Sequence, residues 1–195
     1  MVDVADITTL LAAYREGEPQ AFERLLPLVY DDLRRIARRQ LRASGGKTLD
    51  ATGLVHEAYL KMADQTRLDA RDRGHFLAIC ARAMRQFVVS YARQRHAGKR
   101  GGPALLVVDL DLVSVPVEAQ ADQLVLIDQA LEQLAAIGPR LVRVFECRYF
   151  AGLSEQETAD ALDLPLRTVQ RDWMRARAWL RELLGSADRA GPAPP

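Results

Sequence analysis

Cysteine is scarce in this sequence, and long hydrophobic runs are absent. The two cysteines among the 195 residues, Cys80 and Cys147, each lie within an apolar pattern of helical spacing. We therefore predict buried free thiols in a reducing cytoplasm, not a disulfide framework. No uninterrupted apolar stretch approaches the length of a membrane span, and the N-terminus lacks a signal-peptide pattern. The sequence thus predicts a cytoplasmic protein without a membrane contact.

The patterns that usually mark catalytic and metal sites are also missing. The three histidines, His56, His75 and His96, are spread over different predicted elements and form no ligand pair of metal-site spacing. We find no phosphate-binding loop, nucleophile elbow or pair of catalytic carboxylates. The sequence therefore predicts a protein that is not an enzyme, with no catalytic residue, no metal site and no cofactor.

Acidic residues are absent from one long segment, although the net charge of the chain is only +1. Residues 73–108 contain no Asp or Glu, and Asp109, Asp111, Glu118 and Asp122 follow. The acid-free segment carries the basic residues Arg82, Arg85, Arg93, Arg95, Lys99 and Arg100. An autonomous DNA-binding domain is usually far more basic overall. We therefore expect weak DNA binding by the isolated chain, with affinity supplied by a partner or a local patch.

Apolar residues recur at helical spacing in nearly every periodic segment, which predicts an all-α fold. Gly17 is expected to end a first helix, and Pro19 suits the first turn of a second. Pro27 predicts a kink or a restart within that second helix. A third helix is expected after a cap at Asp50 or Thr52, and a long fourth helix over about 74–97.

Residues 101–119 change character, because Gly101, Gly102 and Pro103 break the helical pattern before a β-branched, acidic run. A single short strand is one interpretation, but no second strand is available to pair with it. We therefore predict an extended linker between two small helical domains. The expected divisions are a first domain over 1–100, a linker over 101–119, a second domain over 120–185 and a disordered tail over 186–195.

The strongest local motif is a helix-turn-helix pattern over residues 152–181. Ser154 and Glu157 have the spacing of a capping box, and Asp163, Leu164 and Pro165 form a turn signal. The second helix of such a motif enters the major groove, where Arg and Gln bind base edges and Thr contacts a methyl group. The residues left on its outer face are Arg167, Thr168, Gln170, Arg171 and Arg175. A solvated basic face on a packing helix is the alternative explanation.

The long fourth helix carries a second candidate site. Its basic and polar residues, a candidate phosphate track, are Arg82, Arg85, Gln86, Arg93 and Arg95. Arg82, Arg85 and Arg93 are expected on one stripe opposite the apolar side. Tyr91 or Phe76 would stack on an unpaired base, unless each simply belongs to the core.

Together these segments resemble the extracytoplasmic-function (ECF) branch of the sigma-70 family of RNA polymerase sigma factors, over about residues 6–184. RYFAGLSEQETADAL and TVQRDWMRARAWL are similar to region 4 of that family. LVHEAYLKM at 54–62 is similar to region 2.2, and ARAMRQFVVSYARQRHAGKRGG at 81–102 to regions 2.3 and 2.4. The resemblance implies a sigma factor that binds core RNA polymerase and directs promoter-specific initiation.

The resemblance also implies a role for each candidate site. His56, Glu57 and Lys61 would dock on the coiled coil of the polymerase β′ subunit, and the second domain on the β flap. Residues of 73–100, including Arg82, Arg85, Gln86, Tyr91, Arg93 and Arg95, would hold the opened strand of the minus-10 element. Residues 167–175 would bind the minus-35 element as duplex. An anti-sigma factor or another regulatory protein is a further expected partner.

A stand-alone helix-turn-helix regulator of transcription is the alternative function. It explains residues 152–181 equally well but leaves the features of residues 54–100 and the near-neutral charge unexplained. Binding to core polymerase distinguishes the two.

Overall fold

The computed structural model describes residues 4–42, 50–63, 69–98 and 119–187 of the chain. All elements in these ranges are helical, so the all-α prediction is confirmed there. The first half contains α1 (Val4–Arg15), α2 (Pro19–Arg42), α3 (Ala51–Ala63) and α4 (Arg73–Gly98). The second half contains α5 (Ala119–Ile137), α6 (Pro139–Phe145), the π-helical turn η1 (Glu146–Ala151), α7 (Glu155–Leu162) and α8 (Leu166–Ala187).

The helix boundaries of the first half follow the expected capping signals. Gly17 adopts a positive φ of 98° after α1, a conformation that glycine takes without steric cost. Of the two expected caps of α3, Asp50 makes the bond, because its carboxylate accepts from the Gly53 N–H at 2.6 Å. Pro27 does not restart α2, which continues through it as one helix. Pro27 lies on the exposed side, where water can bind the carbonyl that its missing N–H would have bonded.

The helix that begins at Pro139 is not regular along its whole length. After Phe145 the chain widens into the π-helical turn η1, which ends at Gly152 in the left-handed conformation with φ 72°. The Leu153 N–H then bonds the Cys147 carbonyl at 3.0 Å. A π-turn inserts an extra residue and so changes which side chains face inward beyond it. Glu146, the first residue of this turn, is buried.

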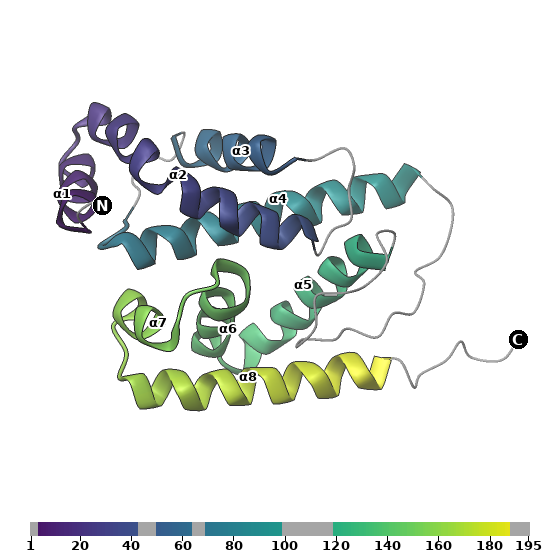
Figure 1. Cartoon of the computed structure of the whole chain (residues 1–195). Helices are drawn as coiled ribbons and strands as arrows, with labels where there is room; N and C mark the ends of the chain where they lie inside the picture. Colours follow the sequence, from purple (N-terminus) through teal and green to yellow (C-terminus); the bar gives the residue numbers. More distant parts are fainter. Residues whose placement is uncertain (1–3, 43–49, 64–68, 99–118, 188–195) are drawn as a thin grey trace, which may run out of the picture.

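Helix α4 lies in the middle of the molecule, with α2 and α3 on one side and α5, α6 and α7 on the other (Figure 1). Its side chains belong to one continuous hydrophobic core that includes Leu33 and Met84 from the first half. The same core includes Leu134 and Phe145 from the second half. The predicted division into two domains stays a prediction, since the halves are packed together here.

The segment expected to link the halves lies largely outside the described residues. Residues 101–118 are not described, and Ala119 already belongs to α5. Of the expected tail, residues 186–187 belong to α8 and the remainder is not described.

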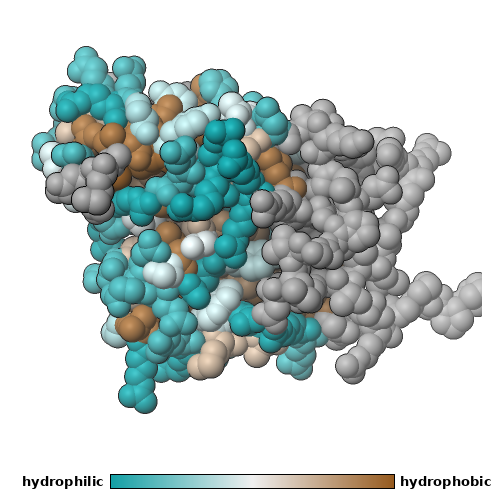
Figure 2. Space-filling view, viewed as in Figure 1, coloured by the Kyte–Doolittle hydropathy of each residue, from teal (hydrophilic) through white to brown (hydrophobic). Residues whose placement is uncertain are grey.

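The visible surface is mostly hydrophilic, with hydrophobic residues gathered in a few small patches (Figure 2). None of the described helices combines the length and the apolar composition needed to cross a bilayer.

Candidate nucleic-acid interface

The predicted capping box at the start of α7 is confirmed. The Glu157 N–H donates to the Ser154 hydroxyl at 3.1 Å, and the Ser154 N–H donates to the Glu157 carboxylate at 2.7 Å. These reciprocal bonds satisfy two backbone donors that the first turn of a helix leaves without partners. They also lower the pKa of Glu157, chiefly through the backbone bond from Ser154. The capping box therefore stabilises the N-terminus of α7, the first helix of the motif.

A tight turn joins α7 to α8. Asp163 takes a left-handed φ of 54°, which Asp tolerates better than most residues, and the Leu164 N–H bonds back to the Ala159 carbonyl at 2.9 Å. The Pro165 carbonyl accepts from the N–H groups of Thr168 and Val169, at 2.8 and 3.2 Å, and so begins α8. The chain thus has the helix, turn and helix order that the sequence predicted.

Helix α8 exposes four of the five residues predicted to read duplex DNA. Arg167, Gln170, Arg171 and Arg175 are exposed, and Thr168 is half-buried. Val169 and Ala176 on the opposite side are fully buried, and Val169 packs with residues of α6 and α7. The predicted set therefore occupies one outward stripe, with Arg167, Arg171 and Arg175 at intervals of four residues.

Two features of α8 were not predicted from the sequence. Met174 is 64% exposed beside Arg175, so the basic stripe contains an apolar contact point. Asp172 is fully buried and accepts from the Arg140 Nε of α6 at 2.6 Å, a bond that raises the pKa of Arg140. This pair joins α8 to α6. The signal available for it was an acid that stands alone among the basic residues of 167–181.

The residues predicted to bind core polymerase share one face of α3. His56, Glu57 and Lys61 are all exposed there, and Leu60 is 45% exposed beside them. Lys61 donates to the Gln86 side chain of α4 at 2.9 Å. Sequence reasoning missed Leu60, which provides an apolar contact on an otherwise polar face.

The predicted stripe on α4 is only partly present. Arg82 and Arg93 are exposed, whereas Gln86 and Tyr91 are half-buried. Arg85 is only 6% exposed, so the expectation that it lies on a solvated stripe with Arg82 and Arg93 is wrong for this structure. The reason is that the second half packs against this side of α4. The side chain of Arg95 lies outside the described residues, as do Lys99 and Arg100.

The aromatic residues of this helix differ in burial. Phe76 is 1% exposed and belongs to the core, so the core interpretation holds for it. Tyr91 is half-buried.

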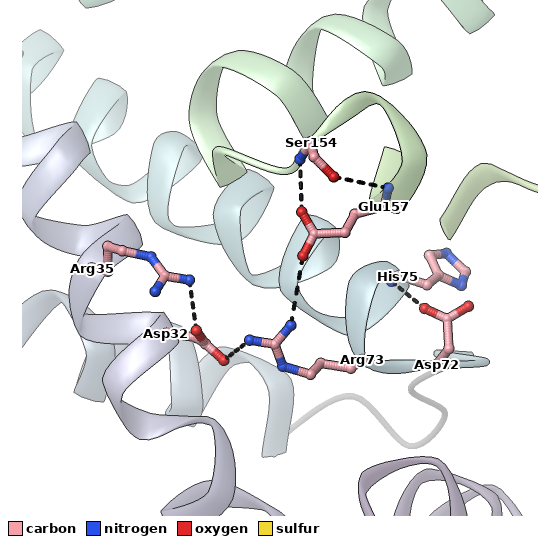
Figure 3. Close-up of polar contacts among 7 residues, drawn as sticks. All are labelled: Asp32, Arg35, Asp72, Arg73, His75, Ser154 and Glu157. Atoms are coloured by element: carbon pink, nitrogen blue, oxygen red, sulfur yellow. Dashed lines mark hydrogen bonds and ion pairs between the residues drawn. The ribbon is translucent and has the colours of Figure 1, made fainter. Parts of the chain in front are cut away.

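Ionic contacts hold the start of α4 close to α7 (Figure 3). Arg73 pairs with Asp32 of α2, and its other terminal nitrogen lies 3.9 Å from the Glu157 carboxylate. Arg35 pairs with the same aspartate at 2.6 Å. Asp72 caps α4 by accepting from the His75 N–H at 2.8 Å. The helix-turn-helix is thereby connected to the first half of the chain through its own capping glutamate.

The remaining titratable groups form no recognisable reactive centre in the described ranges. His75 is partly buried, and burial together with Arg71 lowers its pKa. Cys80 and Cys147 are free and buried, and burial raises the pKa of both thiols. No three ligand-type side chains gather as a metal site in the part of the chain that the structure describes.

One comparison with known proteins gives a match. The model of the family described as ECF sigma factor matches residues 4–186, which is nearly the whole chain and includes the candidate surfaces on α3, α4 and α8. A search of curated proteins gave no match.

Proposed function

Because the chain belongs to the ECF sigma factor family and therefore acts in transcription initiation, we propose that it binds core RNA polymerase and selects promoters with its own helices. The observation that carries the proposal is the outward stripe of α8, where three arginines and a glutamine are exposed on the second helix of a helix-turn-helix. Such a helix reads the major groove, where each base pair presents a distinct pattern of donors and acceptors.

In this proposal α8 binds the minus-35 element as duplex. Arg167, Arg171 and Arg175 supply bidentate donors for guanine edges or phosphates, and Gln170 supplies a donor and an acceptor for adenine. Gln170 now donates to Glu155 at 2.9 Å in an exposed position, so a base can replace that partner at little cost. Met174 would contact a thymine methyl group.

The first half would supply the other contacts. The exposed face of α3, with His56, Glu57 and Lys61, would dock on the β′ coiled coil, and the second half would meet the β flap. Residues of α4 would hold the separated strand of the minus-10 element, which requires compensation for lost stacking of a few kcal/mol per base. Two contacts on one chain raise effective affinity without new interactions.

The test is run-off transcription with purified core polymerase on genomic fragments. Arg167→Ala and Arg171→Ala should reduce promoter choice, whereas Arg82→Ala should impair strand opening, measured by permanganate reactivity of unpaired thymines. Arg24→Ala is the matched control, because Arg24 is an exposed arginine of α2. Transcription by the three site variants at the level of the unmodified protein and of the control would contradict the assigned sites.

The alternative function, a stand-alone helix-turn-helix regulator, predicts a different result. Such a protein binds a specific duplex tightly without core polymerase and does not bind the core. A gel shift with the free chain and a pull-down with core polymerase therefore separate the two proposals.

A further inference from the structure

The guanidinium of Arg85 lies between two carboxylates from the second half of the chain. One terminal nitrogen pairs with Asp128 of α5, and the other donates to Glu146 of η1 at 2.5 Å. The side chains of Arg85 and Glu146 are each 8% exposed, and that of Asp128 is 13% exposed. The guanidinium carbon also lies 5.3 Å from the centre of the Phe150 ring. Arg85 thus contacts anions and an aromatic face, the kinds of group that nucleic acid presents.

A second arginine of α4 has partners on the same helix of the second half. Arg93 lies 3.1 Å from the other oxygen of Asp128 and 3.9 Å from Glu132, one turn further along α5. Asp128 therefore bridges two arginines that are eight positions apart on one helix. Both arginines belong to the candidate phosphate track that was predicted from the sequence.

We infer that Asp128 and Glu146 occupy the places of nucleic-acid phosphates on α4, so that the packed arrangement of the two halves excludes the opened promoter strand from this helix. The inference rests on the proposed function. Carboxylate and phosphate oxygens engage the same N–H groups of a guanidinium, so Arg85 cannot serve both at once. The halves must separate before Arg85 reaches DNA.

Only one of the two proposed DNA surfaces is masked. Helix α8 lies on the far side of the second half from α4 (Figure 1), and the side chains of its outward stripe are exposed. The packed chain therefore keeps its duplex-reading helix accessible and hides a strand-holding arginine. A buried ion pair also contributes little net stability, because desolvation offsets much of its attraction. The ionic part of this contact is thus suited to exchange for another anion.

The start of α4 offers a place to lock the packed form. Arg71 pairs with Asp163 at 3.7 Å and donates to the Ala161 carbonyl at 3.4 Å. A Cβ built on Gly74 would lie 3.3 Å from the Ala161 Cβ. The Cβ atoms of a disulfide are usually about 3.5–4.5 Å apart, so cysteines at these two positions can be joined with a small shift. Neither Gly74 nor Ala161 is among the individual residues proposed to contact DNA or polymerase.

The experiment uses the full chain carrying Gly74→Cys and Ala161→Cys, with purified core polymerase and a promoter that the unmodified protein transcribes. The native thiols are buried, which favours selective oxidation of the engineered pair. We expect run-off product to fall at least tenfold on oxidation and to return when a reductant is added. The two single-cysteine variants, treated in the same way, should not respond.

Equal product from the oxidised and reduced double variant would overturn the inference. Failure of the engineered cysteines to join in the free protein would also overturn it, because the packed arrangement holds them in contact. By contrast, an unmodified protein that gives no product with core polymerase on any fragment would reject the proposed function itself.

An opening variant tests the same inference in the other direction. Asp128→Asn removes the charge shared by Arg85 and Arg93, and should raise run-off product severalfold at limiting core polymerase. Asp31→Asn, an exposed change on α2, is the matched control. A folded Asp128→Asn protein, verified by circular dichroism, that gives no more product than this control would contradict the masking role.

Discussion

Replacing Ser154 with alanine should destabilise the protein by about 1 kcal/mol, the usual cost of removing a side-chain cap from a helix N-terminus. The substitution removes the hydroxyl that accepts from the Glu157 N–H at 3.1 Å. It leaves the second bond of the capping box in place, because that bond comes from the Ser154 backbone. Ser154 is exposed, so no cavity adds to the cost.

The substitution Glu157→Gln removes the negative charge of the capping residue and keeps an oxygen that can accept its hydrogen bond. A glutamine oxygen can still accept from the Ser154 N–H, but the negative charge near the N-terminus of α7 and beside Arg73 is lost. Glu157 is partly exposed, so a loss of about 0.5 kcal/mol is expected from the helix dipole.

The pH dependence of this loss has a definite sign. The folded chain lowers the pKa of Glu157, mainly through the backbone bond from Ser154. A lowered carboxyl pKa contributes stability that is fully present above the unfolded-state value of about 4.3 and disappears as the pH falls through the folded-state value. The stability difference between the unmodified protein and Glu157→Gln should therefore be present at neutral pH and vanish in acid.

Thermal unfolding followed by circular dichroism measures both effects. A change of 1 kcal/mol shifts the melting temperature by about 2–4 °C in a chain of this size. The control is Ser90→Ala, since Ser90 is an exposed serine within α4. An unchanged melting temperature for Ser154→Ala would refute the capping argument, as would a Glu157→Gln difference that grows in acid.

Three further predictions concern other parts of the molecule. Arg167→Ala or Arg171→Ala should each reduce discrimination between promoter variants roughly 5- to 150-fold, from about 1–3 kcal/mol per bidentate base contact, measured by competitive run-off transcription; equal discrimination would remove that arginine from base reading. Burial raises the pKa of Cys147 to about 12 and that of Cys80 further, so both thiols should resist iodoacetamide at neutral pH and react in urea; rapid labelling of the folded chain would contradict their burial. Leu180→Ala should cost about 2–5 kcal/mol in urea unfolding, because Leu180 is fully buried between α8 and the other helices; a smaller loss would mean that the site collapses around the smaller side chain.

Local features of the fold could be predicted from the sequence because their causes are local. The capping box at Ser154, the cap at Asp50 and the left-handed Gly17 each depend on a few neighbouring residues. The outward stripe of α8 also follows from helical periodicity, since its apolar positions define the buried side. The π-helical turn after Phe145 was not predictable in this way, because a shift of one residue in the apolar pattern is too small to distinguish from ordinary variation in helical spacing.

The burial of Arg85 shows where sequence reasoning about the site stops. Periodicity placed one apolar side on α4, and an arginine away from that side was expected to face water. In the structure α4 is covered on both sides. The second half packs against the side that carries Arg85, and its Asp128 and Glu146 supply carboxylates of opposite charge. Long-range pairing of this kind depends on how two halves meet, which neither helical spacing nor capping chemistry determines.

Carboxylates of the second half also explain why a near-neutral chain can still act on DNA. The acid-free segment 73–108 is strongly basic, and the overall charge of +1 arises because acids elsewhere balance it. Two of those acids, Asp128 and Glu132, lie within 4 Å of Arg93 when the halves are packed. Separation of the halves would leave the arginines of α4 free to bind DNA phosphates, although the net charge of the chain stays the same. Electrostatic attraction to DNA should therefore depend on the arrangement of the halves. The Asp128→Asn variant, which favours separated halves, should show a steeper salt dependence of DNA binding than the disulfide-locked Gly74→Cys, Ala161→Cys protein.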